Sequence, residues 1–125
     1  MTPAPLEIIG TYTDEFATTH EITEEAWTIT YPGGAPSLFW IEDFSNDESV
    51  ILARNDAMNE YSPNLYSRFD WVVLQGELWF CQTSYDAASL DAARETPRAD
   101  SSDPSASGCN TFPWSRLTPT PSMTP

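Results

Sequence analysis

The chain contains no lysine, and its basic residues are limited to five arginines and one histidine. Nineteen acidic residues give it a formal net charge of −14 at pH 7 and a pI near 4.1. A nucleic-acid partner needs clustered lysine or arginine to neutralise its phosphates, and an anionic membrane surface repels an acidic protein. The composition therefore excludes nucleic acid as a partner and argues against docking on an anionic membrane.

Long apolar runs are also missing, because none approaches the ~20 residues of a membrane-spanning helix. We therefore expect no membrane span. The 125 residues fit one domain, and 40% hydrophobic residues are enough for an ordinary core. We expect an extended lead-in at 1–5, a single β-domain at 6–117 and a Pro/Thr-rich tail at 118–125.

Only two cysteines are present, Cys81 and Cys109, and the single histidine, His20, lies far from both in the sequence. A zinc site needs more nitrogen or sulfur ligands than these. The remaining interpretations are a reactive or redox-active thiol pair and a structural disulfide, and we expect the disulfide. A disulfide implies an oxidising compartment, so we expect an extracytoplasmic protein that is secreted, periplasmic or surface-anchored.

The first five residues have neither the basic nor the apolar region of a signal peptide. The chain is then either cytosolic or a mature exported form that carries a start methionine. The expected disulfide favours the second interpretation.

Alternating polar and apolar residues predict short strands over most of the chain. The turn-forming residues at 32–36 and the pair Gln75-Gly76 mark hairpins. Good helix formers at 86–95, with Asp86 as N-cap and Pro97 beyond the end, predict one short helix. We expect a mainly β protein, an antiparallel meander of six to seven strands that forms a small barrel or a strongly bent open sheet.

Three segments resemble an uncharacterised group of small secreted or lipid-anchored bacterial proteins. They are GTYTDEFATTHEITEEAW at 10–27, YSPNLYSRFDWVVLQGELWFCQTSYDAASLDAA at 61–93, and the ending SDP…GC…F-x-W-S-x-L. This resemblance implies an exported bacterial protein and supplies no activity.

A fainter similarity is to calycins such as lipocalins. These proteins begin with Gly-x-Trp on the first strand and have a late arginine that packs over that tryptophan. The counterparts in this sequence are Gly10-Thr11-Tyr12 and Arg116. The similarity implies a β-barrel in which Arg116 packs over Tyr12.

Aromatic side chains are the most suggestive feature, with five tryptophans, five tyrosines and six phenylalanines. Outward-facing rings would form a stacking platform for sugars or a pocket for an apolar ligand. The alternative is that the rings fill the core of a small sheet. The candidate ligand-binding residues are Tyr12, Trp27, Trp40, Trp71 and Trp79.

Two further patterns have a functional and a structural interpretation. His20 has carboxylates nearby and could act as a general base, but no nucleophile stands at a recognisable spacing, and we favour a hydrogen-bonded strand histidine. The acidic run at 42–48 offers oxygen ligands for Ca²⁺, but it lacks the spacing of an EF-hand loop and suits any solvated turn. We therefore expect no catalytic residues and no cofactor, with Ca²⁺ at this run as the alternative.

Together these patterns predict a secreted, non-enzymatic β-domain that binds a small ligand, a glycan or a protein partner through an aromatic-lined surface or cavity. A structural or assembly subunit of the bacterial cell surface, able to self-associate through exposed strand edges, is the second interpretation.

Overall fold

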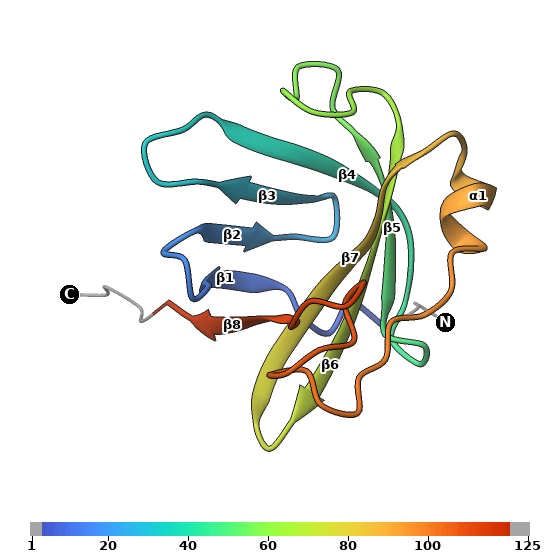
Figure 1. Cartoon of the computed structure of the whole chain (residues 1–125). Coiled ribbons are helices and arrows are strands. Elements are labelled where there is room, and N and C mark those ends of the chain that lie inside the picture. The colour runs from blue at the N-terminus through green and yellow to red at the C-terminus, as the bar shows by residue number, and fades with distance from the viewer. Residues whose placement is uncertain (1–3, 121–125) are drawn as a thin grey trace.

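The computed structural model describes residues 4–120, which form a closed eight-stranded antiparallel barrel with one short helix (Figure 1). Each strand pairs with the next in the chain, and β1 pairs with β8 to close the barrel. The strands are β1 Gly10–Thr13, β2 Thr19–Ile22, β3 Ala26–Thr30, β4 Pro36–Ser45, β5 Val50–Asn55, β6 Tyr66–Leu74, β7 Glu77–Ala87 and β8 Ser115–Pro119.

The predicted mainly β meander is confirmed, but it has eight strands where the sequence predicted six to seven. Strands β2 and β3 contain only four and five residues. Their connection is a tight turn in which the Thr23 hydroxyl accepts hydrogen bonds from the backbone N–H groups of Glu25 and Ala26. The alternation therefore continues through the turn with little interruption, and the number of strands is hard to read from the sequence.

Aromatic rings fill the barrel. Trp27 stacks on Phe69 with ring centroids 4.3 Å apart, and the Phe39 ring meets Phe69 edge-on at 5.3 Å. Aliphatic side chains complete this core, including those of Leu6 and Ile8 in the segment before β1. An eight-stranded barrel is just wide enough for its side chains to fill, and large rings suit such a space.

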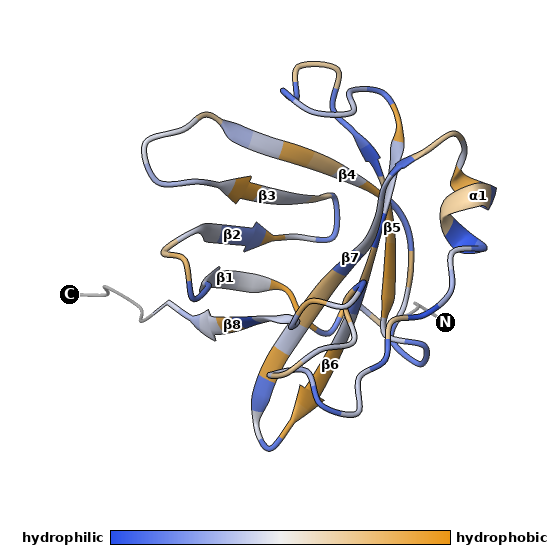
Figure 2. Ribbon diagram, viewed as in Figure 1, coloured by the Kyte–Doolittle hydropathy of each residue, from blue (hydrophilic) through white to orange (hydrophobic). Residues whose placement is uncertain are grey.

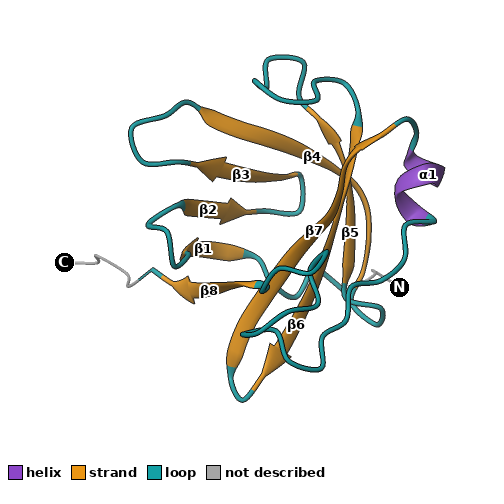
Figure 3. Cartoon of the chain, viewed as in Figure 1, coloured by secondary structure: helices purple, strands orange, loops and turns teal. Residues whose placement is uncertain are grey.

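A cover segment, residues 88–114, lies against the outer wall formed by β5, β6 and β7 (Figure 3). It buries the outward side chains of Val50 and Leu52 beneath α1, and those of Trp79 and Cys81 beside Trp114. Strand β5 is consequently hydrophobic along most of its length, from Val50 to Ala53 (Figure 2). A strand that is covered on both faces has no face in water, so neither face has to be polar.

The helix α1 spans Leu90–Arg94, and Ser89 is its N-cap. The prediction of a helix from 86 with Asp86 as N-cap was wrong at this end, because β7 continues through Asp86 to Ala87. Among residues 4–120, no helix has the length and hydropathy required to cross a bilayer.

The expected boundaries also shift at the chain ends. Strand β1 begins at Gly10, whereas the β-domain was expected from residue 6. Residues 118–119, expected to be tail, belong to β8, and Thr120 donates its backbone N–H to the carbonyl of Thr11. The predicted tail residues 121–125 and the first three residues of the lead-in lie outside the described part.

Cys81 and Cys109 form the predicted disulfide, with their Cα atoms 5.6 Å apart. The bond attaches the cover segment to β7. Beside it, Gly108 has a positive φ of 109°, and a β-carbon there would overlap the carbonyl oxygen of Asp100 and crowd the Trp114 ring. The chain therefore requires glycine where the cover segment passes close to itself.

We predict that Gly108→Ala lowers the free energy of unfolding by about 3 kcal/mol, from backbone strain together with overlap. Gly33→Ala is the matched control, because Gly33 also has positive φ but has open space around the missing side chain. Strain alone gives this control a loss of about 1 kcal/mol. Urea unfolding followed by tryptophan fluorescence measures both, and equal losses would contradict the overlap.

Candidate functional site

The five aromatic residues singled out from the sequence do not share one surface. Trp27 and Trp71 are buried inside the barrel, with exposures of 0% and 4%. Trp79 lies buried on the outer wall beneath the cover segment. Trp40 is half-buried and donates its indole N–H to Asp56, whereas Tyr12 donates its hydroxyl to the carbonyl of Ile8. The packing of these rings follows the core-filling interpretation.

Arg116, which the calycin similarity pairs with Tyr12, lies beside two side chains of β7. The Arg116 guanidinium lies 5.9 Å from the ring centroid of Trp79 and is 3.4 Å from a carboxylate oxygen of Glu77. Both Arg116 and Tyr12 line one hollow, of about 440 Å³, beside the β6–β7 hairpin. The described side-chain contacts of Arg116 are thus with β7, and its backbone N–H donates to the carboxylate of Glu15.

The end of the barrel opposite the β6–β7 hairpin, which we call the mouth, contains two adjoining hollows. The larger has a volume of about 340 Å³ and lies between the end of β3, the start of β4, the loop 56–65 and the second half of β7. The smaller has a volume of about 240 Å³ and lies against the β1–β2 connection and the start of β8. Tyr31 and Gln82 line both hollows.

Exposed aromatic rings surround these hollows. Phe16 is 73% exposed and Tyr61 is 77% exposed, and Tyr31 and Tyr85 are each more than half exposed. Sequence reasoning missed these residues because it followed the strands and the tryptophans. The available signal was the large apolar ring of Phe16 in the otherwise polar turn at 14–19, and that of Tyr61 in a loop.

The floor of the larger hollow is held by a buried amide network. Asn55 donates from its side-chain amide to the carbonyls of Ser62 and Tyr85 and accepts a hydrogen bond from the Ser67 hydroxyl at 2.6 Å. Gln82 donates to the same hydroxyl. The network ties the loop 56–65 to β7, so the ring-bearing segments keep a fixed spacing.

The smaller hollow contains a chain of hydrogen bonds between Asp14, His20 and Trp27. The Trp27 indole N–H donates to His20 Nδ1 at 3.0 Å, so His20 carries its proton on Nε2 and donates it to Asp14 Oδ2 at 2.9 Å. Asp14 Oδ1 accepts from the backbone N–H groups of Phe16 and Thr18. Both nitrogens of His20 are therefore engaged, and neither is free to accept a substrate proton in this arrangement.

Burial lowers the pKa of His20 below its ordinary value, and this effect exceeds the opposing influence of Asp14. The imidazole is therefore neutral at pH 7. The pKa of Tyr31 is raised, mainly by burial and also by the negative charges of Asp14 and an ionised Tyr61. The carboxylate of Asp14 thus acts on the tyrosine that lines both hollows.

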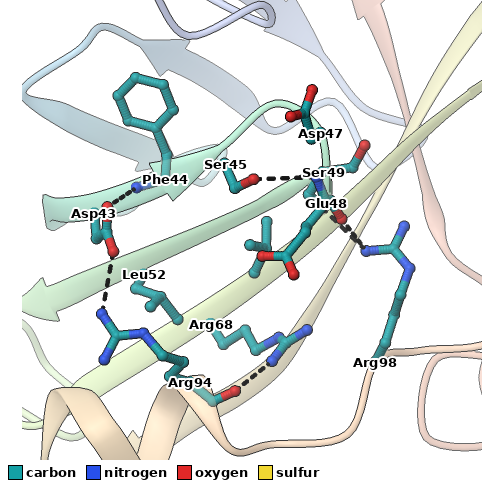
Figure 4. Close-up of a pocket in the computed structure, with 11 residues that line it drawn as sticks. Asp43, Phe44, Ser45, Asp47, Glu48, Ser49, Leu52, Arg68, Arg94 and Arg98 are labelled. Atoms are coloured by element: carbon teal, nitrogen blue, oxygen red, sulfur yellow. Dashed lines mark hydrogen bonds and ion pairs between the residues drawn. The ribbon is translucent and has the colours of Figure 1, made fainter. Parts of the chain in front are cut away.

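A fourth hollow, of about 570 Å³, lies outside the barrel between the β4–β5 hairpin and the cover segment (Figure 4). Three arginines line it. Arg68 donates to the carbonyls of Arg94 and Thr96, and Arg98 donates to those of Glu48, Ser49 and Trp71. These arginines hold the cover segment on the barrel.

Beneath this hollow, the side chain of Asp70 is fully buried. It accepts from the Arg68 Nε–H at 2.9 Å and from the backbone N–H of Ala99 at 2.8 Å. Arg68 is itself 12% exposed. The pair therefore links β6 to the cover segment through a buried charge.

The acidic run considered for Ca²⁺ borders the same hollow. Asp43 there is paired with Arg94 at 3.1 Å. Within residues 4–120, no group of three or more acidic, histidine or cysteine side chains is arranged to hold a metal ion.

We predict that the free energy of unfolding decreases as the pH falls below about 6.5. Burial keeps the pKa of folded His20 below that of the unfolded chain, so in this range the unfolded chain takes up a proton and the folded protein does not. His20→Gln retains an acceptor for Trp27 and a donor for Asp14 but does not titrate. The difference between the two pH–stability curves, from urea unfolding, isolates the histidine, and parallel curves from about pH 7 to about pH 5 would contradict this prediction.

We predict that Asp70→Asn lowers the free energy of unfolding by about 3 kcal/mol, because it leaves the guanidinium of Arg68 without its buried counter-charge. Arg54→Ala is the control. Arg54 pairs with Glu42 at 3.7 Å, and both side chains are about 40% exposed, so its removal should cost less than about 1 kcal/mol. Denaturant titration measures both, and comparable losses would show that burial does not strengthen the Arg68–Asp70 pair.

The chain has no match among protein families, curated proteins or solved structures. No activity or ligand therefore carries over to it from a relative. The mouth, with its exposed rings, fixed amide floor and carboxylate of Asp14, is the described feature with the chemistry of a binding site.

Proposed function

We propose that the protein is a non-enzymatic binding domain that takes a small ligand at the mouth of its barrel. The observation that carries this proposal is the grouping of four exposed rings around two adjoining hollows. Small-molecule sites are concave and lined by aromatic side chains with a few polar groups that orient the ligand. The larger hollow is within the size range of such sites, and the hydroxyls of its tyrosines and the amide of Gln82 supply polar groups.

The state of His20 favours binding over catalysis. It is the titratable side chain in the hollows whose ordinary pKa suits general acid–base chemistry near pH 7. It is 1% exposed and has both nitrogens engaged. Its role in the proposal is to fix the position of Asp14.

The closed topology bears on the second interpretation, a structural or assembly subunit. That interpretation relied on exposed strand edges, which offer unpaired backbone groups to another chain. Here β1 pairs with β8, so the two ends of the meander satisfy each other. The topology therefore favours a ligand site over assembly through strand edges.

The proposal includes an extracytoplasmic location and a lipocalin-like relationship. The disulfide between Cys81 and Cys109 supports the location, because such bonds persist in oxidising compartments. The closed eight-stranded meander supports the relationship by architecture alone.

A neutral apolar dye, N-phenyl-1-naphthylamine, tests the proposed site. We expect its fluorescence to rise on binding, and Tyr61→Ala and Tyr31→Leu to weaken binding at least about fivefold by removing ring contacts. Phe112→Ala is the matched control, because Phe112 is 68% exposed and lines neither hollow. Equal dye affinity in all four proteins would contradict a site at the mouth, as would a lack of binding by the dye, by a panel of neutral glycans and by small organic cations alike.

A further inference from the structure

We propose that the ligand of the mouth is an organic cation whose ammonium group sits in the smaller hollow, beside Asp14 and between the rings of Phe16, Tyr31 and Phe80. This inference rests on the proposed function and adds to it the charge class of the ligand. The rest of the ligand would extend past Tyr31 into the larger hollow.

The first step of the argument is the charge of Asp14. Its side chain is only 7% exposed, and its hydrogen-bond partners are two backbone N–H groups and His20. Trp27 donates to the second nitrogen of His20, which keeps the imidazole neutral. Within residues 4–120, the charge of Asp14 thus has hydrogen-bond donors but no cationic side chain paired with it. A nearly buried carboxylate of this kind attracts a cationic group strongly, because little water screens it.

The second step is the aromatic lining of the same hollow. Phe16, Tyr31 and Phe80 line it together with Asp14. The face of an aromatic ring has negative partial charge and attracts ammonium groups, most strongly those that are alkylated and weakly hydrated. Rings and a carboxylate around one small hollow are complementary to an alkylammonium group, and no single ring would give this preference alone.

The third step is the surrounding field. No arginine lines either hollow. The sequence has no basic residue other than His20 before Arg54, although ten of its acidic residues precede that position. The first four strands therefore contribute no lysine or arginine of their own. The two carboxylates of β4 that pair with arginines from elsewhere, Glu42 and Asp43, line neither hollow. With a net charge of −14, the protein attracts cations to the mouth and repels anions.

The test compares choline with 3,3-dimethylbutan-1-ol, which has the same shape but carries carbon in place of the charged nitrogen. Binding is followed by NMR titration of the Phe16 and Tyr31 ring resonances at low ionic strength. We expect choline to bind at least tenfold more tightly than the alcohol. We also expect 0.5 M NaCl, which shortens the Debye length to about 4–5 Å, to weaken the binding of choline and to leave the binding of the alcohol unchanged.

Two variants locate the interaction. Phe16→Leu keeps apolar bulk but removes the ring face, so choline should bind at least threefold more weakly and the alcohol about equally. Phe112→Leu, at the exposed ring outside both hollows, is the matched control and should bind choline like the wild type. Asp14→Asn should reduce the preference for choline to near unity, and its melting temperature is measured in parallel because Asp14 also holds the β1–β2 turn.

The outcomes separate this inference from the proposed function. If choline and the alcohol bind at the mouth with equal affinity, the proposed positive charge of the ligand is wrong, while the mouth remains a binding site. The same conclusion follows if the neutral dye binds at the mouth and choline does not. If Phe16→Leu leaves choline binding unchanged, the placement of the ammonium group is overturned, and this holds even if Asp14→Asn fails to fold. If no probe binds the mouth, both proposals fall.

Discussion

The hydrogen-bond chain from Trp27 through His20 to Asp14 is the interaction on which the mouth depends. Trp27 anchors it, because its ring is fully buried and stacked on Phe69 inside the barrel. The chain then fixes the tautomer of His20, and His20 fixes the carboxylate that holds the β1–β2 turn and Phe16. A side chain in the middle of the core therefore positions the rim of the site. Three polar groups that are expensive to bury alone satisfy one another.

Most of the fold could be predicted from the sequence, because its signals are local. Alternation marked the long strands, and Gln75-Gly76 marked the β6–β7 hairpin, where both residues adopt positive φ as a two-residue turn requires. Closure of the barrel could not be predicted, because it depends on β8 pairing with β1 across more than a hundred residues. The helix start was misjudged because β7 continues through Asp86, where cross-strand pairing of Ala87 with Tyr66 outweighs local helix propensity.

The site was harder to predict than the fold. Whether an aromatic ring is buried or exposed depends on which elements cover it. The cover segment buries Trp79, whereas Tyr61 is left exposed to solvent. The sequence did show that His20 lies among carboxylates. It did not show which of them is its partner, or that Trp27 occupies the other ring nitrogen, because the three residues meet only when β1, β2 and β3 pair side by side.

The position of β8 at the end of the chain bears on how the molecule assembles. Seven strands are complete by Ala87, but the last one arrives only after the 27 residues of the cover segment. Until β8 is in place, the partly formed sheet therefore has β1 and β7 as open edges, which are sites of aggregation. Cys109 lies shortly before β8 and is bonded to the centre of β7. Once that bond forms, the loop that the final strand must close becomes short, so oxidation should speed completion of the barrel.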